Sequence, residues 1–265
     1  MSFDEQTAAT GKVTLDDVKK FYTDFYNSAQ ATCVIVGDFE KQPVIEEITS
    51  MLQNWSSPEK YTYAMGHYYD APAKSEKINT PDKTNAMMAC GYNLELKDDN
   101  ADYPALIMGN FILGGGFLNS RLATRIRQKE GISYGVGSYL QAGDLDSEGN
   151  FGSYAIYNPE NSDKLMAAYK EELQKILKDG ITEQELADAK SGFLQSRNRI
   201  RSQDNYLVEK LTKYMPLNRT IKWDADQEKA ISSLTTAQIN ATLKKWIKPE
   251  KIVYVQAGDF EKKKN

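Results

Sequence analysis

Arg127 and Tyr134 are the two side chains whose types and spacing suggest that they hold a substrate group. Arginine carries five N–H donors in a planar fork, and the phenol of tyrosine can donate one more hydrogen bond. Gly131 lies between them, and glycine readily takes the left-handed conformation in which helices end. A helix that ends there and reverses into a strand could direct both side chains into a common space. Together they could bind a carbonyl or a carboxylate.

The elements that would position this pair follow from hydrophobic spacing. Leu118, Leu122 and Ile126 recur every fourth residue, as on one face of a helix. After Gly131 large and small side chains alternate, which indicates a strand. Arg127 therefore falls in the last turns of the predicted helix, where a cation interacts favourably with the free carbonyl ends.

Three consecutive glycines, Gly114, Gly115 and Gly116, precede this helix. Because glycine adopts backbone angles that side chains forbid, we expect a loop that opens the helix. A helix start can bind phosphate, but neither a Gly-Lys-Ser/Thr sequence nor a G-x-G-x-x-G frame is present. A tight or flexible loop is the favoured interpretation.

The segment from Gly131 to Gly135 also matches G-x-S-x-G, the nucleophile elbow of serine hydrolases, with Ser133 as the nucleophile. That elbow needs a strand before the serine and a helix after it, whereas the predicted order here is the reverse. The only histidine, His67, also lies upstream of the serine instead of downstream. The sequence therefore disfavours a serine hydrolase.

The histidine count also argues against a metal site in this chain. A catalytic zinc usually takes three protein ligands rich in histidine, and no second histidine or cysteine stands at ligand spacing from His67. We predict that this chain alone contains no catalytic residue and no metal ligand set, and that it binds no cofactor. His67 is interpreted as a packing or surface residue.

Composition limits the class of protein. The chain has 265 residues, 40% hydrophobic and 26% charged, and no stretch approaches the ~20 apolar residues that span a bilayer. Its net charge of −4 argues against nucleic acid as a main partner. Cys33 and Cys90 each lie in an apolar run, so we predict two buried thiols in preference to a disulfide.

The segment RLATRIRQKEGISYGVGS resembles the non-metal half of the insulinase/pitrilysin family of zinc metallopeptidases, the inverted zincins, which include the mitochondrial processing peptidases. That family has a frame like Leu-Arg-x-x-x-Gly-Leu-x-Tyr. Ile126 and Ile132 stand here for its two leucines, with the arginine and the tyrosine in place. The resemblance to the C-terminal module of the family extends from about Thr14 to Phe260.

This resemblance implies a function. Arg127 and Tyr134 would bind a peptide near its scissile bond inside a closed chamber, and Gly114, Gly115 and Gly116 could line its wall. The zinc and the glutamate base would belong to an N-terminal catalytic half, in the same chain or in a separate subunit, that carries His-x-x-Glu-His. This motif is absent here. The fragment alone should therefore be inactive, as one part of a zinc metalloendopeptidase.

Two alternatives remain open. Arg127 could be a cation at a helix end, paired with Glu130 or with bare carbonyls, and Tyr134 could be a core or edge-strand aromatic. The full protein could also be a non-catalytic scaffold or partner subunit of the same family. The presence of both Arg127 and Tyr134 weighs against the second alternative.

An internal repeat predicts the domain organisation. Residues 13–41 match residues 234–262 at a constant offset of 221 (258 − 37), and both copies end in Gly-Asp-Phe-Glu-Lys. We predict that residues 1–57 are the C-terminal helix-strand-helix piece of a preceding similar module, with Ala31–Val36 as its buried strand. Residues 58–73 would be a linker and residues 74–265 a complete module. Chance similarity is the alternative.

The remaining patterns predict an α+β fold. Strands are expected near residues 76–79, 86–94, 149–157 and 252–257, and helices near 103–113, 159–177 and 235–247. Thr182 begins a capping box that starts a further long helix. We expect two layers, a mainly antiparallel sheet covered by helices on one side. Arg197, Arg199 and Arg201 are expected on a solvated face.

Overall fold

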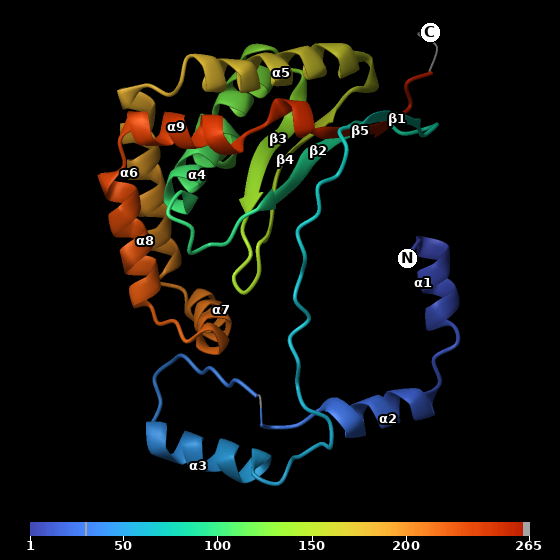
Figure 1. Ribbon diagram of the computed structural model, residues 1–265, viewed down its shortest axis with the longest axis vertical. Helices are drawn as coiled ribbons and strands as arrows, with labels where there is room; N and C mark the ends of the chain where they lie inside the picture. Colours follow the sequence, from blue (N-terminus) through green and yellow to red (C-terminus); the bar gives the residue numbers. More distant parts are fainter. Residues whose placement is uncertain (30, 262–265) are drawn as a thin grey trace. The chain divides into compact units, whose positions relative to one another are not determined.

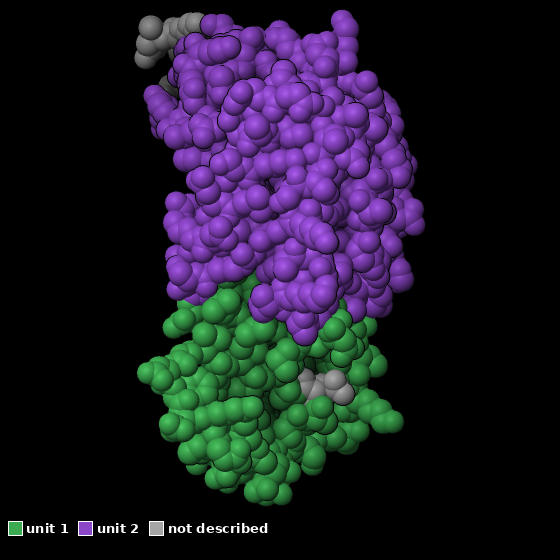
Figure 2. Space-filling model, turned by 90° about the vertical axis from the view of Figure 1, so that its left-hand side faces the viewer, with its two compact units in different colours: residues 1–64, 204–218 green, residues 65–203, 219–265 purple. Residues whose placement is uncertain are grey.

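A computed structural model describes residues 1–29 and 31–261 of the chain. The chain divides into two compact units, which Figure 2 distinguishes by colour. Unit 1 contains residues 1–64 and 204–218, and unit 2 contains residues 65–203 and the residues from 219 onwards. None of the described helices combines the length and the apolar character needed to cross a membrane.

Unit 2 is built on a five-stranded sheet with the order β1-β5-β2-β4-β3 (Figure 1). Its strands are β1 (Ser75–Asn79), β2 (Ala86–Glu95), β3 (Ser133–Gln141), β4 (Glu148–Tyr157) and β5 (Val253–Gly258). Among the described strands, β1 and β5 run parallel and the other neighbouring pairs are antiparallel. The last strand in the sequence, β5, therefore lies between the first two.

Helices pack on one face of this sheet. The longer ones are α4 (Tyr103–Asn110), α5 (Ser162–Lys178), α6 (Glu183–Ile200), α8 (Lys222–Ser233) and α9 (Thr236–Trp246). Short π-helical turns η1 (Phe111–Gly115) and η3 (Ala123–Lys129) are also present, with 3-10 turns η2 (Phe117–Asn119), η4 (Pro159–Asn161) and η6 (Pro249–Lys251). The capping box at Thr182 forms as predicted, because its hydroxyl accepts from the Glu185 N–H while the Glu185 carboxylate accepts from the Thr182 N–H.

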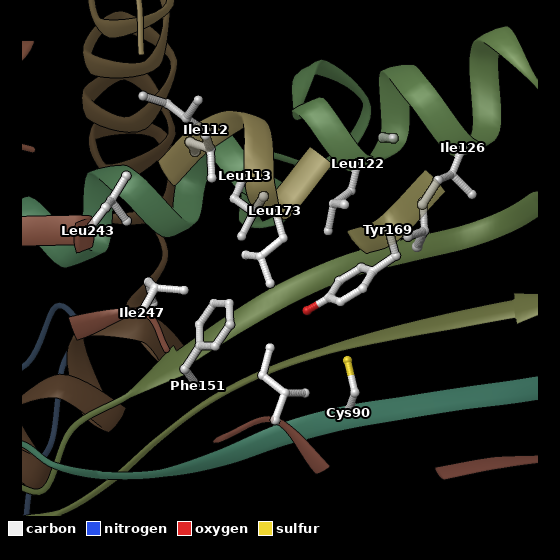
Figure 3. Packing of buried hydrophobic residues seen from close by; sticks show 14 of the residues in the cluster. Cys90, Ile112, Leu113, Leu122, Ile126, Phe151, Tyr169, Leu173, Leu243 and Ile247 are labelled. Carbon is white, nitrogen blue, oxygen red and sulfur yellow. The ribbon is translucent and has the colours of Figure 1, made fainter. Parts of the chain in front are cut away.

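The core lies between the helices and the sheet. Buried and exposed residues alternate along β2, so one face of the strand is covered and the other is not. Figure 3 shows Cys90 and Phe151 on the sheet side of this core, with Tyr169 and Leu173 of α5 on the helical side. The predicted two-layer α+β fold, with a mainly antiparallel sheet covered on one side, is confirmed.

Unit 1 consists mainly of helices. They are α1 (Phe3–Thr10), α2 (Leu15–Phe25), α3 (Lys41–Leu52) and α7 (Asp204–Tyr214), with the 3-10 turn η5 (Met215–Leu217). The predicted strand at residues 31–36 is wrong, since this segment is extended but is assigned to no strand, and Ile35 is exposed. A strand forms only against a neighbouring strand, and the described residues of unit 1 include none. Lys262, the last residue of the repeat, lies outside the described residues.

One of the two cysteines differs from the prediction of two buried thiols. Cys90 is buried, but Cys33 is exposed because its segment has no sheet to cover it. Burial raises the pKa of the Cys90 thiol to about 11, so this thiol stays protonated and inert at neutral pH.

Two of the three arginines near the end of α6 also differ from the prediction, whereas Arg199 is exposed as expected. Arg197 donates to Asp224 and to Glu228 of α8, each at 2.5 Å, and Arg201 pairs with the same Glu228. These two arginines are four residues apart and so lie on one face of the helix. The expectation of a solvated face is therefore wrong for both, because their partners come from a helix that is distant in the sequence.

Two isoleucine-to-alanine substitutions test the one-sided core. Ile126 is fully buried, whereas Ile156 is exposed on the uncovered face of β4. Ile126→Ala should lower the free energy of unfolding by about 2–5 kcal/mol, because it leaves a cavity. Ile156→Ala should change it by about 0.5 kcal/mol. Urea denaturation measures both, and equal losses would contradict the assignment of the faces.

Candidate functional site

The predicted chain reversal at Gly131 is present. Gly131 has a φ of +64°, in the left-handed region. The Ile132 N–H donates to the Ile126 carbonyl at 3.0 Å, which closes the turn between η3 and β3. Arg127 follows Ile126 directly, and Tyr134 comes two residues after Ile132. The helix end is therefore confirmed, with the difference that its last turns are π-helical.

Two arginines of this helical segment are held by carboxylates. Arg121 donates to both oxygens of Glu185, at 2.6 and 2.8 Å. Burial opposes the ionisation of Glu185, but these bonds and those from Thr182 keep its pKa below the usual value. Arg125 pairs with Glu130 at 2.7 Å. The carboxylate of Glu130 is thus engaged by Arg125, and the alternative in which it pairs with Arg127 is not what the structure contains.

Arg127 differs from these neighbours. Its side chain is half-buried, and it makes no hydrogen bond or ion pair with any residue that the structure describes. Its guanidinium therefore keeps its full set of donors. An arginine that is positioned by packed neighbours but has no protein acceptor is suited to binding an external carbonyl or carboxylate.

Tyr134 is presented by a β-bulge. Ser133 lies opposite Tyr157 and Gly135 lies opposite Ile156, so Tyr134 is an extra residue in β3. The Ser133 hydroxyl holds the bulge, because it lies 2.7 Å from the Ile156 carbonyl and accepts from the Gly135 N–H at 3.2 Å. The Tyr134 side chain is 85% exposed. Strand alternation alone would have placed it with the buried residues Ile132 and Val136, and bulges often redirect side chains in this way.

The three consecutive glycines do not form the predicted loop. Gly114 and Gly115 belong to the π-helical turn η1, and none of the three has a positive φ. Gly114 instead allows close packing, since an added Cβ would collide with the backbone nitrogen of Ser138 in β3. The next residue, Phe117, is exposed and has a φ of +54°, a conformation that is costly for a bulky side chain. The sequence carries no signal for this strain.

The uncovered face of the sheet contains a shallow groove of about 600 Å³. Tyr139 lies over Gly152 of the neighbouring strand, where an added Cβ would overlap its phenol ring. Burial raises the pKa of Tyr139, so its phenol remains a hydrogen-bond donor at neutral pH. Asn150 and Val255 line the same groove. Sequence reasoning missed it, because its residues come from strands that are distant in the chain.

The described residues do not fit a metal ion. They contain no group of three or more histidine, cysteine, aspartate or glutamate side chains placed to hold one. A zinc centre needs such a convergent set.

Comparisons with known proteins identify a family and several relatives. The family described as "Peptidase M16 inactive domain" matches residues 12–193. A Helicobacter pylori protein named "Non-peptidase homolog YmxG" is 28% identical over 186 residues, which are 70% of this chain and 42% of that protein. A Streptomyces coelicolor protein named "Uncharacterized zinc protease SCO5738" is 24% identical over 183 residues, which are 67% of this chain and 39% of that protein. The chain thus spans about two fifths of the length of these curated relatives.

Among solved structures, a peptidase M16 inactive domain from Pseudomonas fluorescens superposes with a TM-score of 0.76. It is 25% identical to this chain, and the match covers 93% of this chain and 58% of that structure.

The reversal that positions Arg127 and Tyr134 can be tested with two glycine-to-alanine substitutions. A Cβ at Gly131 would meet no atom within 4 Å, and at Gly135 the nearest atom would be Ile156 Cδ1 at 3.9 Å. Both sites have room, but only Gly131 has a positive φ. Gly131→Ala should therefore lower the free energy of unfolding by about 1–2 kcal/mol. Gly135→Ala should change it by about 0.5 kcal/mol, and equal effects in urea denaturation would refute the strain assigned to position 131.

Proposed function

Since the chain belongs to the family of peptidase M16 inactive domains, we propose that it is the metal-free, substrate-binding half of a zinc metalloendopeptidase. In this proposal the half closes a chamber around a peptide, and the metal site lies in an N-terminal half of the same chain or of a separate subunit. Bound there, the zinc would supply an activated water. This chain would contribute binding and orientation.

One observation carries the proposal. Arg127 and Tyr134 flank a single closed turn, and neither side chain is bonded to any residue that the structure describes. An unpaired guanidinium is unusual at Arg127, which is half-buried, because polar groups of limited exposure normally find partners, whereas the Tyr134 phenol is exposed and open to a ligand. A peptide carbonyl would satisfy both donors. Arg127 would hold that carbonyl, and Tyr134 would donate to the same region or to the oxyanion that develops there during cleavage.

The groove on the uncovered sheet face extends the proposed binding surface. Tyr139 lines the groove and lies five residues beyond Tyr134 on the same strand. At ~3.3 Å per residue this separation is about 16 Å. An extended peptide of about five residues spans it. In this arrangement the groove would hold peptide side chains away from the bond held by Arg127 and Tyr134.

A second function is favoured by one finding, the name "non-peptidase homolog" of the Helicobacter pylori relative. In this alternative the same surface binds a peptide or a partner subunit without cleavage. The two functions differ in what the other half contains. A His-x-x-Glu-His sequence in that half, with zinc bound to it, supports the peptidase.

Substitutions in the protein expressed from its whole gene test the role of the pair. Arg127→Ala and Tyr134→Phe should each lower kcat/KM for peptide cleavage by about 10²-fold, because each removes a donor to the transition state. Zinc content, measured by elemental analysis, should stay unchanged. Peptide cleavage is followed with a quenched fluorescent peptide library.

Lys129→Ala is the matched control, since Lys129 is an exposed cation in the same last turn. It should leave kcat/KM within about twofold of the unmodified protein, because salt screens the charge of an exposed side chain. Normal turnover in both test variants would defeat the role assigned to the pair. Tight peptide binding by an unmodified protein that cleaves nothing would favour the non-peptidase alternative.

A further inference from the structure

The groove on the uncovered sheet face has an uncharged lining. No arginine, lysine, aspartate or glutamate is among the described residues that line it, although 26% of the chain is charged. Its polar groups include the phenol of Tyr139 and the neutral amides of Asn93, Gln141 and Asn150. A charged group that entered the groove would lose water and gain no opposite charge, which is costly. The lining therefore favours a ligand group without charge.

Two tyrosines beside this lining lie over glycines of the neighbouring strand. In the register of β3 with β4, Tyr139 is opposite Gly152 and Tyr154 is opposite Gly137. A Cβ added to Gly152 would lie 2.4 Å from Tyr139 Cζ, and a Cβ added to Gly137 would lie 3.2 Å from Tyr154 Cε1. Each ring thus occupies the space that a side chain on the opposite residue would need. Glycine at both positions lets the two rings lie against the sheet.

The other side of each ring is open. Tyr139 is 42% exposed and Tyr154 is 40% exposed. Both point to the uncovered face, since Ser138, Ser153 and Ala155, their neighbours along the strands, are buried. The two rings together form what we call the tyrosine floor. An aromatic ring that is covered on one side and open on the other offers an apolar surface on which another ring can stack.

The amides beside the tyrosine floor are fixed by contacts within unit 2. The Asn150 side chain donates to the Gln141 side-chain oxygen at 2.9 Å, and the Asn93 side chain donates to the Tyr69 carbonyl at 3.1 Å. Since these amides are already paired, they define the edge of the groove before any ligand binds. The groove is therefore a formed site with a neutral edge and an aromatic floor.

Two acidic residues lie two positions beyond the amides of Asn93 and Asn150. Glu95 ends β2, Glu148 begins β4, and the two lie opposite each other in the register of these strands. Two carboxylates at this place repel a third. An acidic ligand group is thus disfavoured both by the neutral lining and by these neighbours.

We propose that the tyrosine floor is the subsite that selects the substrate, and that it binds an aromatic side chain of the peptide and rejects an acidic one. This inference rests on the proposed function, in which Arg127 and Tyr134 hold a carbonyl near the bond to be cleaved. Every peptide has such a carbonyl, so the tyrosine floor supplies the sequence preference. Tyr139 lies five residues beyond Tyr134 on β3, and the selected side chain is therefore about five residues from that bond in an extended peptide.

Three forms of one peptide test this selection. A library peptide that is cleaved by the protein expressed from its whole gene is made with phenylalanine, glutamine or glutamate five residues from the cleaved bond, once on each side of it. On one side kcat/KM should fall from phenylalanine to glutamine to glutamate, by at least about tenfold in total, because the ring stacks and the charge is rejected. Glutamine and glutamate have nearly the same shape, so the difference between them measures the effect of charge.

Substitutions in the tyrosine floor should reduce this preference. Tyr139→Ala removes one ring and should bring phenylalanine and glutamine to within about threefold of each other. Tyr154→Ala removes the other ring and should shift the preference in the same direction, whereas Tyr139→Phe keeps the ring and should keep the preference. Met87→Ala is the matched control, since Met87 is exposed on the same face but does not line the groove. It should leave all three values of kcat/KM unchanged, and far-UV circular dichroism checks that every variant is folded.

A further variant separates this inference from the proposed function. Arg127→Ala should lower kcat/KM for all three peptides by the same factor, because it acts on the carbonyl that they share. Equal cleavage of the three peptides on both sides of the bond would overturn the tyrosine floor as the selecting subsite and leave the proposed function intact. A preference that both Tyr139→Ala and Tyr154→Ala leave unchanged would have the same meaning.

A protein that cleaves no library peptide would contradict the peptidase function alone. The preference is then measured as binding, by the fluorescence anisotropy of labelled serine-glycine peptides that carry a single phenylalanine, glutamine or glutamate. Tighter binding of the phenylalanine peptide that is lost in Tyr139→Ala supports the tyrosine floor. Equal binding of the three peptides, or no binding, overturns it.

Discussion

The structure of unit 2 depends on apolar packing against only one face of its sheet. Burying Met88, Cys90 and Phe151 under the helices supplies the core, while the opposite face stays uncovered. The elements that carry Arg127 and Tyr134 are fixed by this packing, because Ile126 of η3 and Ile132 at the turn are both buried. The same asymmetry that stabilises the module therefore leaves the other face of its sheet uncovered.

Much of this fold could be predicted from the sequence, because local interactions define most of its elements. The capping box at Thr182 begins a helix where the sequence indicates, and Gly131 ends one with the expected backbone angle. The candidate site was harder to predict from the sequence. The bulge that exposes Tyr134 depends on the pairing of β3 with Ile156 of β4. Arg127 has no ion-pair partner among the described residues because Glu130 pairs with Arg125 instead. The bulge and the ion pair both depend on contacts in the folded chain, and no periodic pattern in the sequence indicates them.

The internal repeat separates what a segment determines by itself from what its surroundings determine. Helices α2 and α9 have equivalent caps and equivalent ends, since these depend on residues within a few positions of each other. The segments that follow these two helices differ in structure. Residues 253–258 form a strand because β1 and β2 supply hydrogen-bond partners on both sides, whereas residues 31–36 have no strand beside them among the described residues. The wrong prediction of a strand there, and of a buried Cys33, has this single cause.

The position of β5 in the sheet also has a consequence for biosynthesis. β1 and β2 are translated long before β5, which begins 158 residues after the end of β2 (253 − 95). At ~5–20 residues per second the ribosome needs about 8–30 s to make that stretch. During this interval β2 has an open edge toward the missing strand, the kind of edge that recruits foreign strands. A nascent chain of this topology thus keeps that edge of β2 exposed until its central strand has been made.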